Sequence, residues 1–161
     1  MSFLTSHITR HICYLTPHTP HLLLFTLFCL FITSCEIEMS DNGKLDGNWQ
    51  LRQIDTLATN GTCDMTYSSI YWGIENDLLQ VRDIDNNNQR ILFRFKHQGD
   101  SLILSQPYNV ITKDELEALE NDSLLRPLGI CGTEEHFLIE QLNSSNLTLK
   151  NPVYRLWFRK Y

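Results

Sequence analysis

The sequence predicts an all-β protein, an antiparallel meander closed into a β-barrel of about eight strands. From Leu45 onward, apolar and polar residues alternate with the period of two that is typical of strands. The alternating runs are short, and clusters of Asn, Asp, Gly and Ser separate them, as in hairpins. A meander of this length closes most simply into a barrel, which also removes exposed strand edges.

The clearest strand runs from Arg90 to His97. Ile91, Phe93 and Phe95 would share one face, and the charged residues between them would share the other. This alternation is typical of a strand with one buried face and one solvated face. The same pattern recurs in seven further runs, at residues 49–57, 69–74, 78–84, 101–105, 137–142, 147–150 and 154–161.

One segment breaks the strand pattern, and we expect a short helix there, at residues 112–120. Thr112 would cap it, Glu115 follows three positions later, and Leu116 and Leu119 lie three apart. An apolar loop follows at residues 124–132. The helix and the loop together would lie across one end of the barrel.

The N-terminal segment has the composition of a signal peptide. Arg10 is its one strongly basic residue, and an apolar run of eleven residues extends from Leu22 to Ile32. A membrane-crossing helix needs roughly 20 apolar residues, so this run suits a signal peptide rather than an anchor. We therefore expect residues 1–34 to be removed.

The segment Ile32-Thr33-Ser34-Cys35 resembles the lipobox of bacterial lipoproteins, in which the cysteine is lipidated and becomes the mature N-terminus. The resemblance implies a covalent lipid on Cys35, a tether at residues 35–44 and a barrel domain at 45–161. It also implies a protein anchored by lipid in the bacterial cell envelope, at the outer membrane, facing the periplasm or the cell surface. The membrane would then be a partner through this lipid.

The charge balance argues against a nucleic-acid partner. The formal net charge is -6, and all 19 acidic residues follow Cys35, whereas one of the 13 basic residues precedes it. The processed domain would therefore be more acidic than the whole chain, which disfavours polyanions.

Two cysteines, Cys63 and Cys131, would remain besides Cys35 after processing. An oxidising compartment permits a disulfide between them, and closing so long a loop would stabilise the fold by about 4 kcal/mol. Two separate thiols are the alternative, and the sequence does not decide between them.

Gly47-Asn48-Trp49 opens the first predicted strand, and the last one is Arg155-Leu156-Trp157-Phe158-Arg159-Lys160-Tyr161. This pair of segments resembles the lipocalin-like (calycin) barrels, particularly those of lipid-anchored exported proteins in Bacteroidetes. The resemblance implies that Trp49 plugs the closed end of the barrel and that a basic residue of the last strand covers the indole. Lys160 and Arg159 are the two alternatives for that residue.

No catalytic or metal-binding pattern emerges from the sequence. The segment that begins at Asp83 starts like a calcium loop, but Asn88 and Arg94 stand where that loop needs Gly and Glu. His97 and His136 are isolated, which makes a poor zinc site. We expect no enzyme activity, no metal and no cofactor.

Three tripeptides resemble the O-glycosylation sequon of exported Bacteroidetes proteins. They begin at Asp55, Asp100 and Asp122. The alternative interpretation is that they are polar strand ends and turns.

Two functions follow from these features. In the first, the barrel binds a small apolar or amphipathic ligand in its interior, lined by Trp49, Tyr71, Trp72, Phe93, Phe95 and Phe158. In the second, the same side chains fill the barrel, and the protein is a structural or interaction module of the envelope that contacts a protein partner. The apolar loop at 124–132 would then be a contact surface if it were exposed.

Overall fold

The computed structural model describes residues 40 and 42–161. The predicted signal peptide, Cys35 and most of the tether lie outside these residues. In the part of the chain that is described, no helix is both long and apolar enough to cross a membrane.

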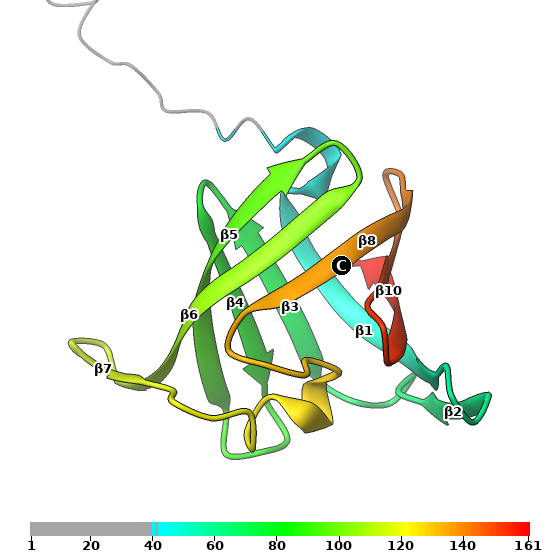
Figure 1. Ribbon diagram of the computed structural model, residues 1–161. Helices are drawn as coiled ribbons and strands as arrows, with labels where there is room; N and C mark the ends of the chain where they lie inside the picture. The colour runs from blue at the N-terminus through cyan, green and yellow to red at the C-terminus, as the bar shows by residue number, and fades with distance from the viewer. Residues whose placement is uncertain (1–39, 41) are drawn as a thin grey trace, which may run out of the picture. The chain divides into compact units, whose positions relative to one another are not determined.

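The described residues form a ring of antiparallel strands (Figure 1). Eight strands make the ring in the order β1-β3-β4-β5-β6-β8-β9-β10, and β10 pairs with β1 to close it. The strands are β1 (Gly47–Thr56), β2 (Gly61–Asp64), β3 (Ile70–Glu75), β4 (Leu78–Asp83), β5 (Gln89–Gln98), β6 (Ser101–Thr112), β7 (Glu115–Ala118), β8 (Glu135–Leu142), β9 (Asn146–Lys150) and β10 (Tyr154–Lys160).

The eight strands of the ring are the eight that the sequence predicts, and the predicted β-barrel is confirmed. Each run of alternating residues forms a strand that has one apolar face. The apolar faces of all these strands are buried together in the interior of the barrel. On β5, Ile91, Phe93 and Phe95 are buried while Arg94 and Lys96 are exposed, as the period of two requires.

The predicted helix at residues 112–120 is wrong. Residues 113 and 114 form a turn, and β7 folds back on β6, with Leu116 opposite Val110 and Ala118 opposite Tyr108. A nine-residue helix is marginal without a packed face. Here every residue of β7 is exposed, whereas the ladder of β6 offers unpaired backbone groups. Backbone pairing with β6 therefore stabilises this segment as a strand, although its residues include those that cap helices.

The two strands outside the ring project from one end of the barrel. β2 pairs with the last four residues of β1, and β7 pairs with the last part of β6. In Figure 1 they extend on opposite sides of the lower end. The sequence does not predict either, because both are four residues long and exposed throughout.

The up-and-down order of the ring gives the barrel two different ends. The closed end carries the 3-10 turn η1 (Gly43–Leu45) and the β3–β4, β5–β6 and β8–β9 turns. The opposite end, called the mouth below, carries the β4–β5 and β9–β10 turns and the whole segment between β6 and β8. That segment contains the second 3-10 turn, η2 (Arg126–Leu128).

Candidate functional site

The closed end is plugged by Trp49, which is fully buried. Its indole Nε1 donates a hydrogen bond to the carbonyl oxygen of Leu45 at 2.7 Å. Lys160 lies over the indole, with Nζ 4.8 Å from the ring centroid, and donates to the carbonyl oxygen of Lys44 at 3.1 Å. Arg159 is exposed on the other face of β10, so Lys160 is the residue that covers Trp49.

Gly47 makes this arrangement possible. It has φ +117°, and a Cβ atom there would lie 2.9 Å from Cε of Lys160. A larger residue would thus be strained in its backbone and would push the lysine away from the indole. The glycine and the tryptophan of the Gly-x-Trp segment are therefore both needed for the contact between Lys160 and the indole.

Five of the six side chains predicted to line the interior do face it. Trp49, Trp72, Phe93, Phe95 and Phe158 are between 0% and 6% exposed. Tyr71 is the exception. It neighbours Trp72 on β3, so it points outward, and its ring packs on Tyr161 with 5.4 Å between centroids. The prediction of Tyr71 as an interior residue is therefore wrong.

The interior side chains pack on one another. The ring of Trp72 contacts Phe158 at 4.9 Å and Phe137 at 5.9 Å between centroids. Among the described residues, Nε1 of Trp72 is the buried side-chain nitrogen or oxygen atom that has no hydrogen-bond partner. An unpaired N–H in an apolar interior costs about 1–3 kcal/mol. The aromatic side chains at the centre of the barrel are thus packed together around one unsatisfied donor.

The mouth is closed by the segment at residues 119–132, called the lid below. Leu125, Leu128 and Ile130 are 0%, 3% and 0% exposed, so these three apolar side chains of the loop are buried, whereas Leu124 is 37% exposed. Gly129 has φ +79°, and a Cβ atom there would overlap the side chain of Leu156 on β10. The sequence predicts that this loop crosses one end of the barrel, and the structure places it there.

Two buried polar side chains hold the lid, and the sequence does not single out either. Asn151 is 3% exposed; its Nδ2 donates to the carbonyl oxygen of Gly129 at 3.3 Å, and its Oδ1 accepts from the N–H groups of Val153 and Tyr154. Glu135 is 6% exposed and accepts from the N–H of Cys131 at 2.5 Å. Asn151 precedes a proline, which indicates only a turn, and nothing local predicts that its amide reaches the lid.

The two remaining cysteines are separate free thiols in the structure. Cys63 is exposed on β2, and Cys131 is half-buried at the end of the lid. Of the two alternatives that the sequence leaves open, the disulfide is therefore not formed here. Burial, together with the nearby Glu135 carboxylate, raises the pKa of the Cys131 thiol.

Neither histidine belongs to a metal cluster. His97 lies 3.0 Å from the carbonyl oxygen of Gly99, and His136 lies 3.1 Å from the carboxylate of Glu134, both on the surface. In residues 40 and 42–161, no group of three His, Cys, Asp or Glu side chains could hold a metal ion. The calcium-like segment is the β4–β5 turn, where Asp83 accepts from the N–H of Asn86.

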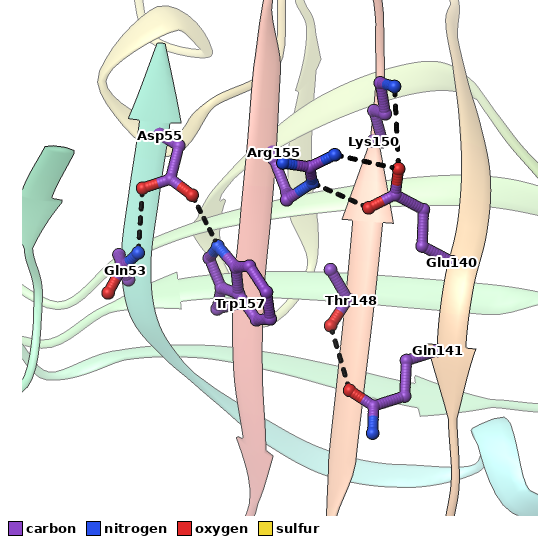
Figure 2. Close-up of polar contacts among 8 residues, drawn as sticks. All are labelled: Gln53, Asp55, Glu140, Gln141, Thr148, Lys150, Arg155 and Trp157. Atoms are coloured by element: carbon purple, nitrogen blue, oxygen red, sulfur yellow. Dashed lines mark hydrogen bonds and ion pairs between the residues drawn. The ribbon is translucent and has the colours of Figure 1, made fainter. Parts of the chain in front are cut away.

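The outer face of β1, β8, β9 and β10 carries separate polar clusters (Figure 2). Asp55 accepts hydrogen bonds from Nε1 of Trp157 at 2.7 Å and from Gln53 at 2.8 Å. Burial works to raise the pKa of Asp55, but these bonds and one from Thr62 outweigh it and hold the pKa below its usual value. The bond from Trp157 to Asp55 therefore fixes the half-exposed ring of Trp157 against the sheet.

A second cluster on this face joins three charged residues. Glu140 accepts two hydrogen bonds from Arg155, at 2.6 and 3.1 Å, and lies 3.5 Å from Nζ of Lys150 (Figure 2). The bonds from Arg155 lower the pKa of Glu140. This is a surface ion-pair network that ties β8, β9 and β10 together.

Three hollows of the described surface lie outside the barrel. The two on the β3–β4 face meet over Gly73, and both are lined by Asn48, Gly73 and Gln80; their volumes are about 680 and 270 Å³. A third, of about 510 Å³, lies at the mouth and is lined by the β4–β5 turn together with Ile111 and Leu124. None of these three is the interior site that the sequence predicts.

Comparison with known proteins identifies the fold family. A family model described as "Lipocalin-like domain" matches residues 28–161. The chain belongs to this family. The lipocalin-like assignment made from Gly47, Trp49 and the last strand is thus confirmed, and the match includes every strand of the barrel.

A solved structure agrees with the lipocalin-like fold. A lipocalin-like protein from Bacteroides uniformis ATCC 8492 is 18% identical with a TM-score of 0.56, over 74% of this chain and 100% of that one. An uncharacterized protein from Bacteroides eggerthii DSM 20697 is 16% identical with a TM-score of 0.49, over 72% of this chain and 98% of that one. Comparison with curated proteins gives no significant match.

The three predicted sequons occupy different surroundings. Ser101 pairs with Leu138 in the sheet, and the leucine that follows it, Leu102, is fully buried. Thr56 is half-buried at the end of β1. Ser123 is exposed on the lid, so the tripeptide that begins at Asp122 is the most accessible of the three.

Proposed function

We propose that this lipocalin-like protein is a lipid-anchored lipoprotein of the bacterial cell envelope whose barrel takes up a small apolar or amphipathic molecule when the lid opens. The proposal rests on the way the lid closes the mouth. The mouth is closed by a loop and not by strands, and two side chains, Asn151 and Glu135, anchor that loop. Such a loop can move away while the strand ladder stays intact.

The interior offers suitable chemistry once the lid is displaced. Leu125, Leu128 and Ile130 would leave an apolar space, and apolar burial would drive a hydrophobic group to replace them. Nε1 of Trp72 supplies one unsatisfied donor in the aromatic core. A hydroxyl or carbonyl oxygen on the ligand would satisfy that donor, which favours an amphipathic molecule over a pure hydrocarbon.

The anchoring half of the proposal rests on the lipobox-like segment that ends at Cys35. Two acyl chains give stable membrane attachment, whereas one chain gives only marginal attachment. The protein would act as a binding protein at the outer membrane and not as an enzyme. It would need no cofactor, and the acidic surface disfavours nucleic acid.

The ligand half is tested by fluorescence of the buried tryptophans. In a Trp157→Phe chain, Trp49 and Trp72 remain, both fully buried. The acylated protein in lipid nanodiscs is mixed with a bromine-labelled fatty acid, a short-range quencher. Uptake into the barrel should quench the emission.

Variants of two adjacent lid residues provide the matched control. Leu125→Ala removes a buried contact of the lid and should accelerate quenching severalfold, whereas Leu124→Ala alters a side chain that is 37% exposed and should not. Emission that no brominated ligand quenches, with or without Leu125→Ala, would contradict uptake into the barrel.

The anchoring half is tested by replacing Cys35. The unaltered chain should incorporate labelled palmitate in cells and partition into detergent, and Cys35→Ser should do neither. Cys63→Ser is the control, since it removes a thiol without touching the lipobox-like segment. If the Cys35→Ser chain were still labelled and still partitioned into detergent, the proposed acylation of Cys35 would be wrong.

A second candidate function is favoured by the packing of Trp72 on Phe137 and Phe158 inside the barrel: an envelope interaction module that binds no small ligand. Large apolar side chains are exposed around the mouth, at Ile84, Ile111, Leu116 and Leu124, which are 44%, 48%, 50% and 37% exposed. Ile111 and Leu124 line the same hollow. Clustered apolar exposure of this kind is typical of protein contact sites.

Photo-crosslinking in cells distinguishes the second candidate. A photoreactive residue in place of Leu116 should give one defined adduct. The same residue in place of Leu138, which is 44% exposed on the outer face of β8, is the control. Equal adducts from both positions, or none, would remove the support for this candidate.

A further inference from the structure

The chain enters the barrel at a fixed point on the closed end. Ser40 donates to a carboxylate oxygen of Asp46 at 2.7 Å and accepts from the N–H of Asn76 at 3.2 Å. The side-chain amide of Asn42 donates to Ser40, to Asp46 and to the carbonyl oxygen of Asn76, at 2.7, 3.0 and 2.7 Å. Through Ser40 and Asn42, these bonds fasten the start of the described chain to the β3–β4 turn.

The β3–β4 turn belongs to the closed end, together with η1 and the β5–β6 and β8–β9 turns. The lid, with Leu125, Leu128 and Ile130, belongs to the mouth. In Figure 1 the β5–β6 turn and η1 lie at the top, and the lid lies at the bottom. The point of entry and the mouth are therefore at opposite ends of the barrel.

The distance from Ser40 to the proposed acylated residue is limited by the covalent chain. Cys35 precedes Ser40 by five residues, and a fully extended chain spans at most about 3.6 Å per residue, or about 18 Å in all. The six residues of β4, which run from the β3–β4 turn to the mouth, extend about 20 Å, which a strand tilt of about 40° converts to about 15 Å along the barrel axis. Only a tether drawn out straight along the outside of the barrel would bring Cys35 to the level of the mouth, so a less extended tether keeps the lipid nearer the closed end.

We infer that the barrel is held with its closed end toward the anchoring bilayer and its mouth toward the aqueous phase. This inference rests on the proposed acylation of Cys35. Its consequence is that a ligand reaches the interior from the aqueous side, or from a carrier in it, and not by lateral transfer from the bilayer that holds the protein. The lid then separates an apolar interior from water, which explains why its inner side chains are so completely buried.

Short-range quenching from the membrane surface tests the orientation. In a chain with Cys63→Ser and Cys131→Ser and with Cys35 acylated, a fluorophore is attached either at Ser144→Cys, in the β8–β9 turn, or at Lys113→Cys, in the β6–β7 turn. Both positions are exposed, the first at the closed end and the second at the mouth. The protein is reconstituted in phosphatidylcholine vesicles that contain lipid with a spin-labelled headgroup.

The closed-end label should be quenched severalfold more than the mouth label. Equal quenching, or stronger quenching of the mouth label, in a chain that partitions into the vesicles overturns the orientation and leaves the acylation standing. A chain whose partitioning does not depend on Cys35 overturns both. The two failures are therefore distinguishable.

A second variant tests the role of the hydrogen bonds at the entry point. Ser40→Ala with Asn42→Ala removes all five side-chain bonds that fasten the segment. The first fixed residue then becomes Lys44, whose carbonyl oxygen Lys160 holds, and the reach of the free tether increases from about 18 to about 32 Å. The difference between the two labels should shrink, and an unchanged difference would overturn the claim that this network sets the orientation.

Discussion

The ammonium group of Lys160 lies 4.8 Å from the centre of the Trp49 indole, at the closed end of the barrel. The first strand of the ring supplies the indole, the last strand supplies the cation, and the two residues are opposite each other in the β1–β10 ladder. The contact therefore sits on the seam where the barrel closes, and it also satisfies the carbonyl oxygen of Lys44.

Lys160→Met should lower the free energy of unfolding by about 1 kcal/mol, because it removes the cation–π contact and leaves a carbonyl oxygen without its donor. Arg159→Met is the matched control, since Arg159 is exposed and lies on the opposite face of the same strand. Urea unfolding followed by tryptophan fluorescence measures both. Equal effects of the two substitutions would mean that the contact with Trp49 contributes nothing.

Gly47→Ala should destabilise the protein by about 1–3 kcal/mol, because φ +117° is strained for alanine and the new Cβ meets Lys160. The part due to Lys160 can be separated by a double-mutant cycle with Lys160→Ala. In that background the clash is absent, so Gly47→Ala should cost less. Additive effects of the two changes would contradict a steric link between these residues.

Gly129→Ala should loosen the lid. The substitution strains φ +79° and forces a Cβ atom into the side chain of Leu156. We expect faster amide hydrogen exchange at residues 125–131 and increased binding of an apolar dye, with the strands of the ring still protected. Leu156→Ala in the same chain should restore part of the lid's protection. Loss of protection throughout the barrel would show that the lid is not an independent unit.

Stability should depend on Glu140 at acid pH. The bonds from Arg155 hold the folded-state pKa of Glu140 below its ordinary value of 4.5. A lowered pKa adds stability that is present above pH 4.5 and is lost as the pH falls through the folded-state value. Unfolding measured from pH 7 down to pH 3 should therefore show Glu140→Gln less stable than the unaltered protein at neutral pH. The difference should shrink in acid, and a constant difference would contradict the ion-pair explanation.

The two cysteines should react at different rates with a thiol reagent at neutral pH. Cys63 is exposed, whereas Cys131 is half-buried and its pKa is raised by burial, so less of it is thiolate. Cys63→Ser should remove the fast phase and Cys131→Ser the slow one. If protein isolated from its own compartment had no reactive thiol until it was reduced, the cysteines would be bridged there.

The sequence alone determined the ring. The period-two alternation is a local property, because each strand needs only its own residues to have one apolar face, and all eight strands follow from it. Gly47, Trp49 and the last strand likewise carried the lipocalin-like assignment, and the alternation along β10 from Phe158 to Lys160 already made Lys160 one of the two alternatives for the residue over Trp49.

The conformation of the segments that lack this alternation is decided by tertiary contacts alone. The segment at 112–120 has helix signals, yet it became the β6–β7 hairpin because β6 supplied backbone partners that no local pattern reveals. The lid is held by Asn151 and Glu135, whose roles depend on contacts across the mouth. Whether five buried aromatic side chains line a cavity or fill it depends on volumes summed over the whole barrel, and such a sum has no sequence signature.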